Sequence, residues 1–222
     1  MSTPPNLRYG RHPERGVADR AVIDAILDSQ LTCHVAFVVD GWPYAVPTVH
    51  ARDGDRLLVH GSTLSRMLGE LRGGVPVCIT VTGIDGIVCA RSAFNHSINY
   101  RSAMVFGTAT PVRGDEAKLA ALRAIVEHVL PGRWDEVRPP KRTELRATEI
   151  VALPLDRATA KVRTGPPVDS PADRRSPVWS GVIPISEAAG QPVMVPDDVA
   201  GLRLPVPSSV LAALARGSAR QR

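Results

Sequence analysis

The alternation of apolar and polar residues over much of the chain is typical of short β-strands. Asp40-Gly41 separates two β-rich runs and predicts a hairpin, because this pair tolerates the positive φ angles of a two-residue turn. Closely spaced antiparallel strands favour a small closed barrel, since closure removes exposed strand edges. The strands expected are residues 31–39, 42–51, 57–60, 75–81, 87–90, 102–109 and 150–155, with 75–81 and 87–90 pairing across a turn at 83–86.

Three stretches show helical spacing of apolar residues instead. They are residues 17–29, a short segment from Met67 to Leu71, and residues 115–130, which begin at Asp115-Glu116 and end near Pro131-Gly132. The pattern as a whole therefore predicts a mainly β fold with flanking helices.

The segment between the strand that ends at His60 and the helix near Met67 carries candidate chemistry. A helix N-terminus presents unpaired N–H groups and a positive dipole end, so anions bind there. Ser62, Thr63 and Ser65 add hydroxyl groups, and Arg66 adds a guanidinium group suited to phosphate. The segment predicts a phosphate site without the spacing of a Walker A loop; an ordinary N-capped helix is the alternative.

Charge distribution and hydrophobicity exclude some classes of protein and of binding partner. The net charge of +5 is concentrated near the two ends and at Arg174-Arg175, with no basic stripe along one helix, so we expect no nucleic-acid partner and an anionic cofactor or substrate instead. No apolar run approaches the roughly 20 residues of a membrane span, and residues 1–8 lack the apolar core of a signal peptide. We therefore expect a cytoplasmic protein without a membrane partner.

The remaining composition bears on metals and on domain organisation. Cys33, Cys78 and Cys89 fall in or beside expected strands without metal-type spacing, so we expect buried thiols in a reducing cytosol and no metal site. Proline is dense from residue 165 onward, which favours extended segments over a second domain. We expect an N-terminal arm at residues 1–15, a barrel domain at 16–185 and a Pro-rich, basic extension at 186–222.

Several ordered motifs resemble a known family. They are Asp40-Gly41-Trp42-Pro43-Tyr44, Val46-Pro47-Thr48, His60-Gly61-Ser62 with Ser65-Arg66, and Asn99-Tyr100-Arg101-Ser102 followed by Val105-Phe106-Gly107. Together they look like the pyridoxamine 5′-phosphate oxidase-like family, and within it the FMN-binding split-barrel branch that includes the nitroimidazole-resistance proteins. The resemblance covers roughly residues 8–185, and pieces at 131–134, 160–167 and 178–184 also look like that branch.

The resemblance implies a homodimeric split β-barrel with FMN at the boundary between the subunits. The residues it implies for cofactor binding are Val46, Pro47, Thr48, Val49, His60, Gly61, Ser62, Ser65, Arg66, Asn99, Arg101, Ser102, Lys161 and Trp179. Trp179 would cover the flavin from the partner subunit, and Lys161 would lend charge to the same cleft. A core or interface role is the alternative for both.

Three residues are candidates for catalysis. In nitroimidazole-resistance relatives a histidine in the matching strand belongs to the active site, which is what the resemblance implies for His60. Arg101 would lie at the pyrimidine edge of the flavin, where a cation raises its electron affinity; a surface ion pair is the alternative. Tyr100 would stack on the ring or pack at a subunit contact.

The expected function is that of an FMN-dependent oxidoreductase acting on a small organic substrate of unknown structure. The tail at residues 206–222 lacks the Arg-x-His motif of true pyridoxamine-phosphate oxidases, which argues against vitamin B6 oxidation. Three alternatives stay open: a haem bound by a histidine such as His60 or His96, a deazaflavin cofactor, and a flavin-binding protein without turnover.

Overall fold

One antiparallel sheet organises the chain in the computed structural model, which describes residues 7, 9–193 and 205–219. Its ten strands run in the order β1-β9-β6-β5-β2-β3-β4-β8-β7, with β10 pairing β5 beside this path. The strands are β1 (Gly16–Val17), β2 (Thr32–Val39), β3 (Trp42–Asp53), β4 (Arg56–Ser62), β5 (Pro76–Cys89), β6 (Ser97–Thr108), β7 (Thr110–Pro111), β8 (Thr148–Pro154), β9 (Ala158–Arg163) and β10 (Gly181–Pro184).

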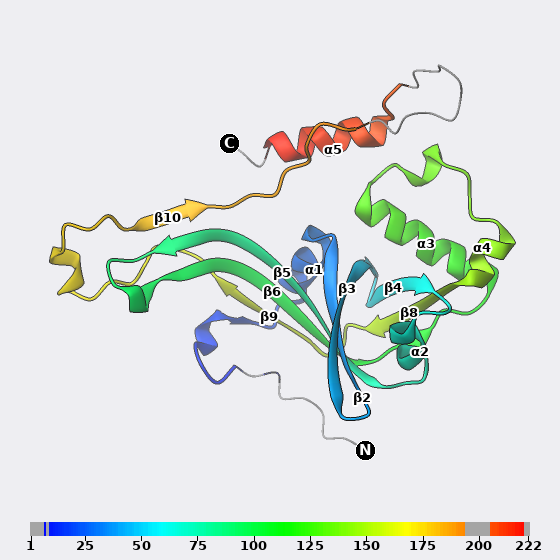
Figure 1. Cartoon of the computed structure of the whole chain (residues 1–222), viewed down its shortest axis with the longest axis horizontal. Helices are drawn as coiled ribbons and strands as arrows, with labels where there is room; N and C mark the ends of the chain where they lie inside the picture. Colours follow the sequence, from blue (N-terminus) through cyan, green and yellow to red (C-terminus); the bar gives the residue numbers. More distant parts are fainter. Residues whose placement is uncertain (1–6, 8, 194–204, 220–222) are drawn as a thin grey trace.

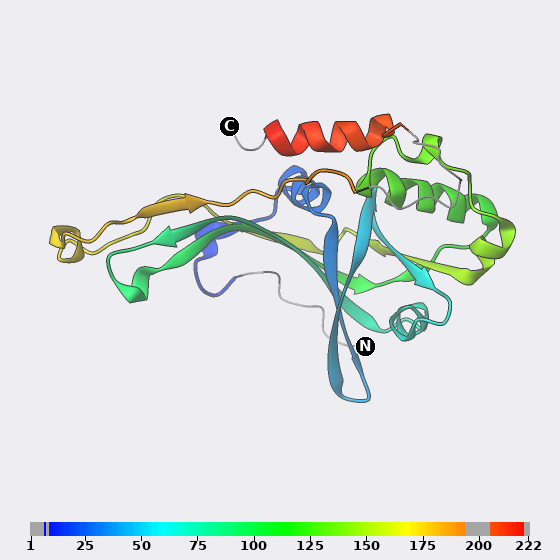
Figure 2. The ribbon, with the colours of Figure 1, turned by 45° about the horizontal axis from the view of Figure 1, so that its top comes forward.

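Helices flank this sheet, as Figures 1 and 2 show. The predicted mainly β fold with flanking helices is therefore confirmed. The α-helices are α1 (Arg20–Ser29), α2 (Arg66–Arg72), α3 (Asp115–Val129), α4 (Arg142–Ala147) and α5 (Ser208–Ala219), and the short 3-10 helices are η1 (Pro13–Arg15), η2 (Ala93–Asn95), η3 (Trp134–Glu136) and η4 (Asp173–Arg175).

Two apolar clusters form the core. The larger joins α1 and α2 to the inner faces of the strands, with Leu27, Val35 and Leu57 completely buried. The smaller lies between α3 and the sheet, around Leu58 and Ile150. Neighbouring residues of β4 thus serve different clusters, because successive side chains of a strand point to opposite faces.

The Asp40-Gly41 turn forms as predicted, with φ angles of 50° and 78°. The predicted turn at residues 83–86 is wrong. Residues 76–89 form one strand, β5, with a bulge between Ile84 and Gly86. The two glycines do not form a turn but allow side chains to approach the backbone of β5 closely. A Cβ at Gly83 would lie 2.9 Å from Arg101, and one at Gly86 would lie 2.9 Å from Val182.

Beyond the barrel, β5, β6 and β10 extend together as a long arm (Figure 1). Ile183 lies opposite Ile87, which lies opposite Ile98, so the three side chains form a row across the arm. Each of these isoleucines is at least 41% exposed. The arm therefore presents an apolar face that nothing in the described part of the chain covers fully.

The helix α5 is anchored by Glu136 of η3. Its carboxylate accepts hydrogen bonds from the Ser208 hydroxyl at 2.8 Å, the Ser209 backbone N–H at 3.1 Å and the Ser209 hydroxyl at 2.5 Å. These donors favour the charged carboxylate and lower the pKa of Glu136 to about 2. A helix thus follows the segment in which the proline content favoured extended chain.

Candidate functional site

The turn between β4 and α2 supplies the candidate phosphate site. The backbone is fixed by the N–H of Thr63, which donates to the Ala147 carbonyl at 2.9 Å, and by that of Ser65, which donates to the Ser62 carbonyl at 2.9 Å. The Ser65 hydroxyl caps α2 by accepting the Leu68 N–H at 3.4 Å, as in the N-cap alternative. The Ser62 hydroxyl accepts the Leu64 N–H at 3.2 Å. Both hydroxyl groups keep their own hydrogen for a further acceptor.

Arg66 begins α2 and lies over an aromatic ring. Its guanidinium carbon is 4.9 Å from the centre of the Tyr44 ring, and Tyr44 stacks on Phe37 at 5.4 Å. No carboxylate pairs with Arg66 among the residues that the structure describes. A guanidinium held by stacking keeps its N–H donors available to an anion.

His60 lies two residues before Ser62 on β4, opposite Ile150 of β8. Its side chain is half-buried, and the enclosed Nδ1 has no hydrogen-bond partner in the described part of the chain. Burial lowers the pKa of His60, so the ring is neutral at pH 7. A neutral imidazole is the form that ligates iron or accepts a proton.

The four predicted residues on β3 do not share one face. Val46 packs against the larger core cluster and Val49 against the smaller one. Pro47 lies opposite His34 with its side chain exposed, and Thr48 lies opposite Cys33. Only the backbone of this stretch could therefore contact a single ligand along its length, and Pro47 contributes no N–H.

The predicted residues on β6 also point in different directions. Tyr100 lies opposite Ile84 and Arg163, whereas Arg101 lies opposite Gly83 and Val162, so the two side chains occupy opposite faces of the sheet. No hydrogen bond, ion pair or ring contact in the described residues joins either one to His60. The described residues thus show no direct contact among the three predicted catalytic residues, and their shared role stays a prediction.

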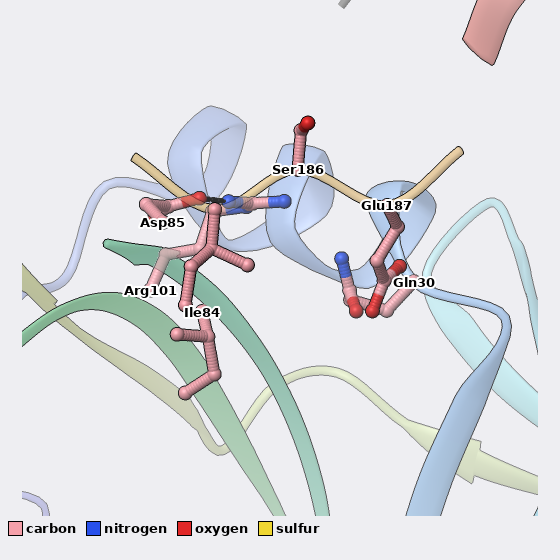
Figure 3. A pocket seen from close by; sticks show the side chains of 7 residues that line it. Gln30, Ile84, Asp85, Arg101, Ser186 and Glu187 are labelled. Atoms are coloured by element: carbon pink, nitrogen blue, oxygen red, sulfur yellow. Dashed lines mark hydrogen bonds and ion pairs between the residues drawn. The ribbon is translucent and has the colours of Figure 1, made fainter. Parts of the chain in front are cut away.

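Arg101 forms the ion pair that was its alternative. Its Nη1 bonds the Asp85 carboxylate and its Nε donates to the Ser29 hydroxyl at 3.4 Å. Gln30, Asp85, Arg101, Ser186 and Glu187 line one cavity near α1 (Figure 3). The sequence did not single out Gln30, Asp85, Ser186 or Glu187; the only local signal was the spacing of Gly83 and Gly86.

The other predicted binding residues have partners inside the chain. The Asn99 amide donates to the Gly165 carbonyl at 3.1 Å, and its oxygen accepts from buried Arg163. The Ser102 hydroxyl donates to the Lys161 carbonyl at 3.5 Å. The Lys161 ammonium donates to the Arg11 carbonyl at 3.2 Å and lies 4.8 Å from the centre of the Tyr9 ring.

Gly61 and Trp179 complete the predicted set. Gly61 lies opposite Glu149 on β4, and a Cβ there would lie 3.0 Å from Leu68. Trp179 is 65% exposed and precedes β10, which lies on the arm, away from α2 (Figures 1 and 2). A contact between Trp179 and a ligand at the β4–α2 turn therefore requires a second copy of the chain.

The described residues lack two other features that would change the class of protein. No three His, Cys, Asp or Glu side chains gather as a metal site there. Likewise, none of the helices described is both long enough and apolar enough to span a membrane.

Comparison with known proteins identifies the fold and the family of this chain. The fold is that of flavin-binding split barrels. A sequence model described as pyridoxamine 5′-phosphate oxidase matches residues 19–162. The chain belongs to the pyridoxamine 5′-phosphate oxidase-like family, so the predicted membership is confirmed. A search of curated proteins found no match.

Three solved structures are similar to the chain. A FAD and haem binding protein from Mycobacterium smegmatis is 39% identical, with a TM-score of 0.85 over 90% of this chain and 97% of that one. The flavocytochrome Anf3 from Azotobacter vinelandii is 36% identical, with a TM-score of 0.85 over 93% and 95% of the two chains. A putative 5-nitroimidazole antibiotic resistance protein from Bacteroides thetaiotaomicron is 25% identical, with a TM-score of 0.55 over 66% and 86%.

Proposed function

We propose that this protein is a flavin-dependent redox protein that holds the flavin by its 5′-phosphate at Ser62, Ser65 and Arg66. The observation that carries the proposal is the guanidinium group of Arg66, which has no carboxylate partner among the described residues and stacks on Tyr44. Arg66 directly follows Ser65, the N-cap of α2, and Ser62 lies in the same turn. Phosphate oxygens accept charge-assisted hydrogen bonds from such a set. A bound flavin would supply hydride or single-electron transfer.

The proposed phosphate site is compatible with either FMN or FAD. The family resemblance implies FMN, whereas the similar protein from M. smegmatis is described as binding FAD. Both flavins carry the phosphate that the β4–α2 turn suits, so the turn accommodates either. Chromatography of the cofactor released from the purified protein distinguishes them, and its absorbance distinguishes both from a deazaflavin.

A haem is the second candidate, and His60 is the residue that favours it. Two solved structures that match nine tenths or more of this chain are described as a FAD and haem binding protein and as a flavocytochrome. His60 would be the residue that holds the haem iron, because its ring is half-buried, its pKa is lowered by burial, and its Nδ1 has no hydrogen-bond partner in the described residues. His96, the other candidate, is exposed and donates from Nδ1 to the Ser92 carbonyl at 2.9 Å.

The absorbance spectrum of the purified protein tests both cofactors. We expect flavin bands near roughly 370 and 450 nm together with a haem band near roughly 400 nm, since the protein only tunes these chromophores. A flavin spectrum without the haem band, after haem has been supplied during expression, would overturn the haem assignment. A protein that takes up neither flavin nor haem would overturn the proposal.

We also propose that two copies of the chain form a dimer through the arm. The row of Ile87, Ile98 and Ile183 is exposed, and a twofold partner covers such a face in both copies at once. We expect Ile98→Lys to convert a dimer into a monomer in size-exclusion chromatography with light scattering. Thr108→Lys, at the exposed other end of β6, is the matched control, and an Ile98→Lys protein that stays dimeric would contradict the arm interface.

The organisation proposed around this site has three parts. They are an N-terminal segment at residues 1–15, of which Tyr9 and Arg11 contact Lys161, a barrel domain at residues 16–185, and an extension at residues 186–222 that includes α5. The substrate is proposed to be a small organic electron donor or acceptor.

A further inference from the structure

The cavity near α1 that Arg101 lines has a volume of about 250 Å³. Its walls come from the end of α1, from β5 and β6, and from the segment that follows β10. This segment is held in place by the Ile185 N–H, which donates to the Asp85 carbonyl at 3.1 Å. The cavity shares no lining residue with the β4–α2 turn.

Hydrogen-bond donors gather on one side of the cavity. Arg101 uses Nη1 for Asp85 and Nε for Ser29, which leaves the N–H groups of Nη2 without a partner in the described residues. A Cβ at Gly83 would lie 3.0 Å from Arg101 Nη2 and 3.0 Å from Gln30 Nε2, so both groups lie over the same glycine. Two adjacent N–H donors, one of them charged, suit a carboxylate.

Hydrogen-bond acceptors lie on the opposite side of the cavity. Figure 3 shows the side chains of Gln30 and Glu187 at one end of the cavity and the guanidinium group of Arg101 extending from Asp85 toward Ser186. Glu187 has no ion pair in the described part of the chain. Gln30 is only 8% exposed, and its side-chain oxygen has no hydrogen-bond partner among the described residues. A carboxylate and an amide oxygen suit an ammonium group.

The charges and the apolar surface of the cavity limit the kinds of ligand that fit it. The ion pair with Asp85 uses Nη1 of Arg101 and leaves the Nη2 donors for a carboxylate, while the negative charge of Glu187 suits a cationic group. Ile84 and Ile185 line the remaining wall with apolar surface. A ligand that satisfies every wall carries a carboxylate, an ammonium group and a short apolar side chain.

We propose that this cavity binds a small apolar α-amino acid, with its carboxylate at Arg101 and Gln30 and its ammonium group at Glu187. The cavity shares no lining residue with Ser62, Ser65 and Arg66, where the flavin phosphate is proposed to bind. Ligand binding here is therefore measured separately from flavin content, and failure of one assignment leaves the other intact.

Isothermal titration calorimetry of the full-length protein with L-valine tests the proposal. Two probes each lack one charged group: 3-methylbutanoate has no ammonium group, and isobutylamine has no carboxylate. We expect L-valine to bind and each analogue to bind roughly tenfold more weakly or worse, because one charge-assisted contact is lost. Absence of L-valine binding at millimolar concentration, or equal affinity for isobutylamine, would overturn the proposal.

Two variants locate the binding within the cavity. Gly83→Ala displaces the ends of Arg101 and Gln30 without removing either, and Glu187→Gln removes only the charge that faces the ammonium group. Each is expected to weaken L-valine binding about tenfold, while Gly10→Ala, where a Cβ meets nothing within 4 Å, leaves it unchanged. Flavin content and melting temperature establish that the variants fold, and unchanged L-valine affinity in folded Glu187→Gln protein would contradict the site.

Discussion

Replacing Arg66 with alanine is expected to weaken flavin binding about tenfold to hundredfold. The guanidinium group stacks on Tyr44 and has no carboxylate partner in the described part of the chain, so its donors are free for the flavin phosphate. Loss of one charge-assisted contact costs about 1.5–3 kcal/mol, which corresponds to this loss of affinity. Fluorescence quenching of FMN and FAD during titration of the apoprotein measures it.

Riboflavin separates phosphate binding from a structural role of Arg66. It lacks the phosphate, so its affinity should change little in Arg66→Ala. Arg123→Ala is the matched control, because Arg123 is exposed and pairs with Asp135 at 3.4 Å, on α3 and not at the turn. If riboflavin and FMN lose affinity equally, Arg66 stabilises the turn without contacting the phosphate.

Replacing His60 with alanine is expected to lower haem affinity by about a hundredfold, because the iron loses a protein ligand and not only an outer contact. Titration of the protein with haem, followed at the band near roughly 400 nm, measures the change. Added imidazole should restore the spectrum of the variant by occupying the vacated position. His96→Ala should behave as wild type, and the reverse ranking of the two variants would reassign the ligand.

The pH dependence of the same titration follows from burial. Burial lowers the pKa of His60 in the folded protein, so the ring takes up a proton at a lower pH than an exposed histidine does. Haem binding through His60 should therefore weaken at a more acidic pH than binding through an exposed histidine such as His96 would. Weakening that begins above pH 7 would indicate a different ligand.

Local periodicity was sufficient to predict most of the core elements. Most elements fall close to the predicted ranges: the strands β2, β3, β4, β6 and β8 and the helices α1, α2 and α3. One face of each is buried, so its apolar residues recur with the period of a strand or a helix. The continuity of β5 was missed, since Gly83 and Gly86 resemble turn residues when only neighbours along the chain are considered. Their reason lies in contacts with Arg101 and Val182, distant in sequence.

The candidate site was predictable only where it is local. The turn at Ser62–Arg66 is contiguous in sequence, so its donors could be recognised together. The grouping of His60 with Tyr100 and Arg101 came from the resemblance, and the strand period of two separates Tyr100 from Arg101. The cavity around Arg101 draws on residues 30, 84–85, 101 and 185–187, which only the folded chain brings together.

The contact between Glu136 and α5 has a consequence for acid tolerance. A carboxylate with a pKa of about 2 stays charged in any moderately acidic solution, and its contribution to stability declines only as the pH falls from the ordinary glutamate value toward 2. Mild acidification should therefore leave the contact between Glu136 and the C-terminal helix in place.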